Sequence, residues 1–307
     1  MNSIFQEISI STLLYTLGTI LLTFLILFLG KAVYRLLHPS IPVDHTLVKE
    51  DNVAFAYSHT GYLLGLLLAV SATIKGSSYG ILSDTLDIII YGAVSILLIN
   101  LAGWVQDRWI FSKFSIKDEI LRDRNTGAGV LQGASYVAAG LILMGAISGD
   151  DSLPFLYKYM DLDIAGRSPW WALGNTIIFW AIGQIILLLA VKFYNAITPY
   201  NIHKEIEKDN VAVGIGTSGA FIAIGILISN GISGEFISWS DTGYSLLLEV
   251  VIGLILLPLS RFVCDKLLLP GEDLTHEMVE QETANIGAGT IEAFSYIASA
   301  LLIVWLL

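Results

Sequence analysis

The sequence predicts an all-α membrane protein with eight transmembrane helices, built from four two-helix hairpins. Of its 307 residues, 55% are hydrophobic and only 14% are charged, whereas a soluble domain carries about a quarter charged residues. The apolar residues form long blocks, such as residues 12–37 and 246–269, and about 20 apolar residues cross the hydrocarbon core as a helix. A short motif at the start of every second block predicts the repeat.

The predicted spans are residues 13–37, 53–74, 86–107, 126–147, 170–194, 211–231, 245–268 and 285–306. We interpret the first block as a true span and not as a cleavable signal. It lacks a basic segment before it and an A-x-A site after it, and it is longer than the apolar core of a signal peptide.

The distribution of basic residues predicts the orientation. Of the 16 lysines and arginines, all except Lys75, Lys158 and Arg167 lie in or beside the connections after spans one, three, five and seven. The positive-inside rule therefore places these connections in the cytoplasm of a bacterial inner (plasma) membrane, with both termini on the non-cytoplasmic side. The outer loops are acidic, and they either concentrate cations or are simply solvated. Their acids are Asp84, Asp150, Asp151, Asp161, Asp163, Glu235 and Asp241.

Composition and motifs exclude several classes of function. The net charge of −11 argues against nucleic-acid binding. The single cysteine, Cys264, excludes an intrachain disulfide and any CxxC motif. The chain contains no H-E-x-x-H or P-loop motif, and we expect neither an enzyme nor a metal or cofactor site.

Four asparagines begin the even-numbered spans in a shared pattern, Asn-x-small-x-small: Asn52, Asn125, Asn210 and Asn285. A charged, amphipathic stretch precedes each one. The first and third copies share Asp-Asn-Val-Ala, and the second and fourth share Asn-x-Gly-Ala-Gly followed by Ser-Tyr. We therefore predict two four-span units, residues 1–160 and 161–307, each a duplicated hairpin. The hairpins would be parallel repeats, pseudo-symmetric about the membrane normal.

The Asn-x-Gly-Ala-Gly motif, the charged lead-in and the paired spans resemble the DUF350 (UPF0719-like) family of multi-pass bacterial membrane proteins. The resemblance covers nearly the whole chain, as two tandem four-span copies. It implies the architecture and the membrane location, and it implies no particular mechanism.

Small residues are concentrated in the even spans, for example at Gly127, Gly129 and Gly133. Such residues let helix backbones approach closely within lipid. We predict an inner bundle of even helices wrapped by lipid-facing odd helices. Alternatively, the glycine-rich faces form a homo-oligomer interface.

A polar residue follows each repeat asparagine by seven positions: His59, Gln132, Thr217 and Glu292. Seven residues make nearly two turns, so each polar residue lies on the same helix face as its asparagine, about 10 Å deeper. Even helices around a common axis would then present two polar layers, and Glu292 could pair with His59. These layers are either an ion pathway or hydrogen bonds that fix helix register. The asparagines are either ligands or helix caps.

Other polar positions lie on the odd spans. Glu249 is an intramembrane acid that either reaches the outer interface or faces the bundle. We expect Asn100, Asn175 and Gln184 to bond neighbouring helices.

Two functions remain open. The first is a channel or transporter for a small cation or proton, with its path between the even helices. The second is a membrane anchor or scaffold for a cytoplasmic protein partner, in a system of the envelope-stress type.

Overall fold

The computed structural model describes residues 10–76, 78, 80–148, 169–234, 238–269, 271 and 273–306. Within these ranges it has eight helices that are long and apolar enough to cross a membrane, which confirms the predicted number of spans. The predicted boundary at residue 160 lies outside the described residues. So do several charged loop positions named above: Asp150, Asp151, Lys158, Asp161, Asp163, Arg167 and Glu235.

The long helices are α1 (Ile10–Leu37), α3 (Val53–Lys75), α4 (Ile81–Trp109), α6 (Thr126–Ile147), α7 (Pro169–Ile197), α9 (Val211–Ile232), α10 (Trp239–Val263) and α11 (Ile286–Leu306). A π-helical segment, η2 (Cys264–Leu268), continues α10. Helices α4 and α10 begin earlier than predicted. Their first turns contain Asp84 and Asp241, and hydropathy locates only the apolar part of a helix.

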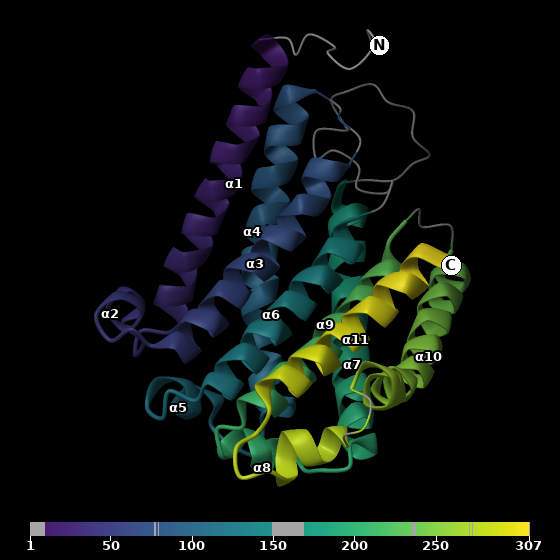
Figure 1. Cartoon of the computed structure of the whole chain (residues 1–307). Helices are drawn as coiled ribbons and strands as arrows, with labels where there is room; N and C mark the ends of the chain where they lie inside the picture. Colours follow the sequence, from purple (N-terminus) through teal and green to yellow (C-terminus); the bar gives the residue numbers. More distant parts are fainter. Residues whose placement is uncertain are drawn as a thin grey trace, which may run out of the picture.

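Four short segments lie together at one end of the molecule (Figure 1) and correspond to the charged, amphipathic stretches. They are α2 (Val43–Val48), α5 (Ile116–Leu121), α8 (Ile202–Glu207) and the π-helical η3 (His276–Glu280). Each precedes one of the helices α3, α6, α9 and α11 and buries apolar side chains, such as Ile120, Ile206 and Met278. We call this the short-helix end. Helix α1 begins and α11 ends at the opposite end.

The even-numbered spans form a row. Helix α3 packs on α6, α6 on α9, and α9 on α11, and Figure 1 shows the four side by side and running in the same direction. They do not surround a common axis, so that expectation is wrong.

Glycines on two faces of the central helices explain the row. A Cβ at Gly61 of α3 would collide with the backbone of Gly133 in α6. On the other face of α6, a Cβ at Gly214 of α9 would collide with Gly127. Gly129, which meets α3, and Gly127, which meets α9, are two residues and therefore about 200° apart on α6. The two neighbours thus lie on opposite faces of α6, as in a row and not in a closed ring.

The same contacts occur in both halves of the chain. Gly129 lies against the backbone of Ala54, and Gly289 lies in the same way against Ala212. The α3–α6 and α9–α11 interfaces are therefore built alike.

Burial follows position in the row and not odd or even number. Helices α6 and α9, in the middle, are the most buried of the spans, and α1 is the least. The edge helix α11 exposes Phe294 and Leu302, whereas the odd helices α4 and α7 are half buried. The prediction that all even helices lie inside is therefore wrong for α11.

Candidate functional site

All four repeat asparagines are helix caps. The side-chain oxygen of Asn52 accepts a hydrogen bond from the Phe55 amide at 2.9 Å. Asn125, Asn210 and Asn285 accept equivalent bonds at 2.8, 3.1 and 3.2 Å. Such a cap satisfies one of the amide groups that the first helical turn leaves without a partner. Of the two roles considered for the asparagines, capping is confirmed.

The side-chain nitrogens of the first three asparagines join one hairpin to the next. The Asn52 side-chain nitrogen donates to the carbonyl of Ile120 in α5 at 2.9 Å. Asn125 donates to Ile206 in α8 at 2.5 Å, and Asn210 donates to Met278 in η3 at 2.8 Å. The repeat spacing alone could not reveal this second role, because the acceptor lies about 70 to 80 residues further along the chain.

An acid in three of the short segments completes the arrangement. Glu119, Glu205 and Glu277 accept hydrogen bonds from the side chains of Asn125, Asn210 and Asn285 at 2.9, 3.3 and 2.7 Å. A negative charge beside a helix N-terminus is also favoured by the helix dipole. The acid lies six, five and eight residues before its asparagine, and this irregular spacing gave no sequence signal that could have identified these residues.

Replacing Asn125 with alanine is expected to lower the thermal midpoint in detergent much more than replacing Asn285. Loss of a cap costs about 0.5–2 kcal/mol. Asn125 is also 2% exposed, so Asn125→Ala removes a buried hydrogen bond to the Ile206 carbonyl, a further loss of about 0.5–1.5 kcal/mol, although the Asp209 amide still donates to that carbonyl. Asn285 is exposed, and its side-chain nitrogen donates to Glu277 and to no carbonyl of another short segment among the described residues, which makes Asn285→Ala the matched control. Equal shifts in the two variants would contradict the joining role.

The four polar residues seven positions beyond the asparagines fall into separate environments. Gln132 accepts a hydrogen bond from Ser58 of α3 at 2.5 Å and donates to Asp107 of α4 at 3.4 Å. His59, 3% exposed, lies among the rings of Tyr34, Phe55 and Tyr62. Its two ring nitrogens have no hydrogen-bond partner among the described residues.

Glu292 is the centre of a charged cluster in the second unit. It is 0% exposed and forms a buried ion pair with Arg261 of α10. The Tyr296 hydroxyl donates to it at 3.0 Å, and Arg261 also donates to Thr275 at 3.1 Å. The suggested pairing of Glu292 with His59 is wrong, because α6 and α9 lie between their helices in the row.

A pocket leads to this cluster from the short-helix end. Its volume is about 220 Å³ and its lining includes Arg261, Tyr296, Asp265, Asp273 and Thr275. The last two residues lie immediately before η3. Arg261 and Tyr296 therefore line the pocket, and Glu292, which both of them bond, is buried behind them within the transmembrane part of the chain.

The first unit has a neutral counterpart of the ion pair. Gln106-Asp107-Arg108 at the end of α4 corresponds to Cys264-Asp265-Lys266 after α10, which aligns Gly103 with Arg261. The shared Asn-x-Gly-Ala-Gly motif aligns Gln132 with Glu292. A Cβ at Gly103 would touch the Tyr136 ring at 2.7 Å.

Matching hydrogen bonds support this alignment. Ser135 donates to the carbonyl of Gln132, and Ser295 donates to that of Glu292, both at 2.7 Å. The equivalent positions thus carry Gly103 and Gln132 in the first unit, where Gln132 bonds Asp107, and the ion pair of Arg261 and Glu292 in the second.

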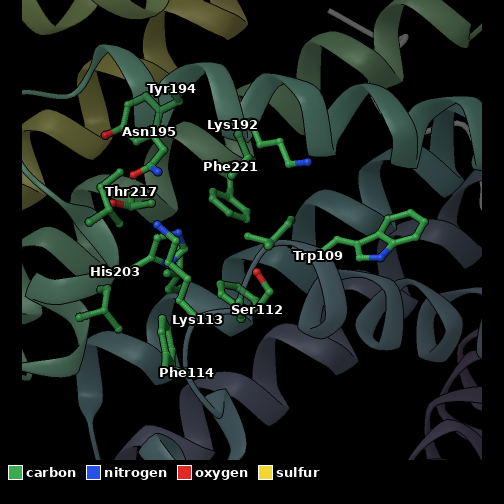
Figure 2. A pocket seen from close by; sticks show the side chains of 16 residues that line it. Trp109, Ser112, Lys113, Phe114, Lys192, Tyr194, Asn195, His203, Thr217 and Phe221 are labelled. Atoms are coloured by element: carbon green, nitrogen blue, oxygen red, sulfur yellow. The ribbon is translucent and has the colours of Figure 1, made fainter.

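Thr217 lies apart from Glu292, in a second pocket between the two units (Figure 2). It is 2% exposed, and its hydroxyl has no hydrogen-bond partner among the described residues. The pocket is formed by the α4–α5 connection on one side and by α7, α8 and α9 on the other.

Glu249 faces the bundle and not the outer interface. It is 6% exposed and accepts a hydrogen bond from Asn230 of α9 at 2.6 Å. Two further expectations of helix-to-helix bonding are confirmed. Asn100 donates to the Tyr62 hydroxyl at 3.0 Å, and Gln184 accepts from Gln106 at 3.4 Å.

Comparison with known proteins gives the family. The model of the family described as Domain of Unknown Function (DUF350) matches residues 7–147 and again residues 168–307. A UPF0719 transmembrane protein of Aquifex aeolicus (strain VF5) is 23% identical over 261 residues, covering 85% of this chain and 88% of that protein. No solved structure matches. With two tandem matches that span most of its length, the chain is an integral membrane protein that belongs to the DUF350 family.

Proposed function

We propose that the protein transports a proton or a small cation across the membrane, and that Glu292 is the group whose charge changes during transport. The observation that carries this proposal is the buried Arg261–Glu292 pair, whose arginine lines a pocket. Ionisable side chains inside transmembrane segments are costly and usually serve a pathway or a substrate.

The neutral counterpart in the first unit strengthens the case. Gln132 and Gly103 occupy the positions equivalent to Glu292 and Arg261. The same packing is therefore compatible with uncharged side chains at these positions. Because the packing does not need charges at these positions, a function in transport explains the presence of Arg261 and Glu292 better.

The packing of the row favours a carrier over a permanent channel. Gly61, Gly214 and Gly219 bring the backbones of neighbouring helices into direct contact. These contacts leave no space for a permanent pore between the even helices. A carrier would instead open the Glu292 site to each side of the membrane in turn.

The test is a flux assay with purified protein in liposomes that contain a pH-sensitive dye. Glu292→Gln is expected to reduce proton or cation-coupled flux at least about tenfold, because the side chain keeps its shape and loses its charge. Glu249→Gln, which changes another buried acid, is the matched control and should retain flux. His59→Ala tests in the same assay whether the buried histidine of the first unit contributes to flux. Flux that is unchanged in Glu292→Gln would refute the proposal.

A second function rests on a different observation, the adjacent position of the four short segments at one end (Figure 1). This end, which we predict to face the cytoplasm, exposes Lys49, Lys113 and Lys204. We propose as the alternative that it binds a cytoplasmic protein partner, with the spans as an anchor. Absence of flux under every gradient, together with a partner that is lost on charge reversal of Lys49 and Lys204, would favour this function.

A further inference from the structure

The pocket between the two units combines unpaired basic groups with an apolar wall. Its volume is about 250 Å³, below the range of about 300–1,000 Å³ that is usual for drug-sized ligands. Trp109, Phe111, Phe114 and Phe221 form much of its surface. A pocket of this size suits the headgroup of a larger amphiphile.

Polar groups gather at one end of the pocket. Figure 2 shows Lys113, His203, Asn195 and Thr217 close together there, with Lys192 on the rim towards Trp109. Lys113 and Lys192 are exposed. Neither has an ion pair or hydrogen bond with another residue in the described ranges. Two unpaired ammonium groups at one pocket are complementary to an anion.

Buried groups without partners also point to a ligand. The Thr217 hydroxyl is almost fully buried and has no partner among the described residues. The Asn195 side-chain oxygen is likewise buried and unpaired. A buried polar atom without a hydrogen bond destabilises the folded protein, and a hydroxyl-bearing or phosphate-bearing headgroup could supply the missing partner.

His203 adds a polar group without a full charge. Burial, and then the nearby Lys113, lower the pKa of His203 below its usual value, although Glu207 opposes this effect. The ring is therefore mainly neutral at pH 7 and can donate or accept a hydrogen bond.

The position of the pocket identifies the source of the anion. It lies at the short-helix end of α4 and α7, and Trp109 at its rim is 56% exposed, as is usual for tryptophans at a membrane interface. We propose that this pocket binds the phosphate headgroup of an anionic membrane lipid, with Lys113 and Lys192 as the charge contacts and Thr217 as a buried hydrogen-bonding contact. Basic pockets between transmembrane helices are known to take such headgroups.

The test measures retained lipid by native mass spectrometry of the full-length protein. Phosphatidylglycerol is expected to bind more tightly than phosphatidylethanolamine. The double variant Lys113→Gln/Lys192→Gln should weaken phosphatidylglycerol binding about 25-fold, at about fivefold per lysine. The control Lys49→Gln/Lys117→Gln removes the same charge from the same end of the molecule, away from the pocket, and should leave binding unchanged.

Thr217→Val and competition by inorganic phosphate complete the test. Thr217→Val keeps the shape of the side chain and should weaken the headgroup contact about two- to tenfold without changing the phosphatidylethanolamine signal. Equal binding of the two lipids, or equal loss in the two double variants, would overturn the proposal. So would lysine-dependent binding of inorganic phosphate that excludes the lipid, because the ligand would then be a soluble anion.

Discussion

Leucine at position 61 is expected to prevent the protein from accumulating in folded form. A Cβ at Gly61 would overlap the backbone of Gly133, and a backbone cannot move aside as a flexible side chain can. Overpacking of a core usually costs about 1–3 kcal/mol. Since this collision separates two helices along their whole contact, we expect Gly61→Leu to exceed about 4 kcal/mol, which is exceptional for a single substitution.

The control is leucine at Gly18, in the lipid-exposed helix α1. No atom lies within 4 Å of a Cβ placed there. Glycine is about 0.8–1.0 kcal/mol less favourable than alanine inside a helix, and leucine is close to alanine, so Gly18→Leu should be neutral or stabilising. Fluorescence-detected size-exclusion chromatography, with thermal midpoints for the folded fraction, measures both variants. A normal monodisperse peak for Gly61→Leu would show that α3 and α6 are not packed through their glycines.

The features that the sequence predicted correctly depend on residues that are close together in the chain. Hydropathy is a local property, and it located all eight spans to within one or two turns. Capping by Asn52 and its counterparts is also local, because the acceptor and the donor are three residues apart. The repeat was visible because the two units preserve the same contacts, such as Gly129 on Ala54 and Gly289 on Ala212.

The arrangement of the helices could not be predicted in the same way. Glycine content shows that backbones approach closely, but it does not say how many neighbours each helix has. A ring and a row both satisfy the pattern. The row results from two glycine faces on α6, at Gly133 and Gly127, and it separates His59 from Glu292.

The partner of Glu292 was missed for a related reason. Arg261 was counted with the basic residues that set the orientation, and its position four residues before Asp265 gave no sign that its side chain points inward. An alignment of the two units would have identified Arg261 as the partner, since Gly103 and Gln132 occupy the positions equivalent to Arg261 and Glu292.

The second large effect is expected on the free energy of unfolding when the Arg261–Glu292 pair is changed. The effects of the two substitutions should be strongly non-additive. Arg261→Met should cost about 3–5 kcal/mol, because it leaves the buried carboxylate of Glu292 unpaired. Glu292→Gln should cost less, since the Arg261 side chain is 16% exposed and also bonds Thr275.

The double variant Arg261→Met/Glu292→Gln decides between structure and function. Replacing both members of a buried ion pair with neutral groups is often neutral or stabilising, and the first unit already has neutral residues at these positions. We therefore expect the double variant to recover to within about 1 kcal/mol of the native protein.

Thermal midpoints of the four proteins in one detergent measure this coupling as a double-mutant cycle. The exposed pair Arg122–Asp123, with side chains 72% and 41% exposed, is the control, and its coupling should not exceed about 1 kcal/mol. If the double variant folds normally but carries no flux in liposomes, the charge is needed for transport and not for packing. If the double variant stays as unstable as Arg261→Met, the pair is structural, and the packing of the second unit requires the charges that the first unit lacks at these positions.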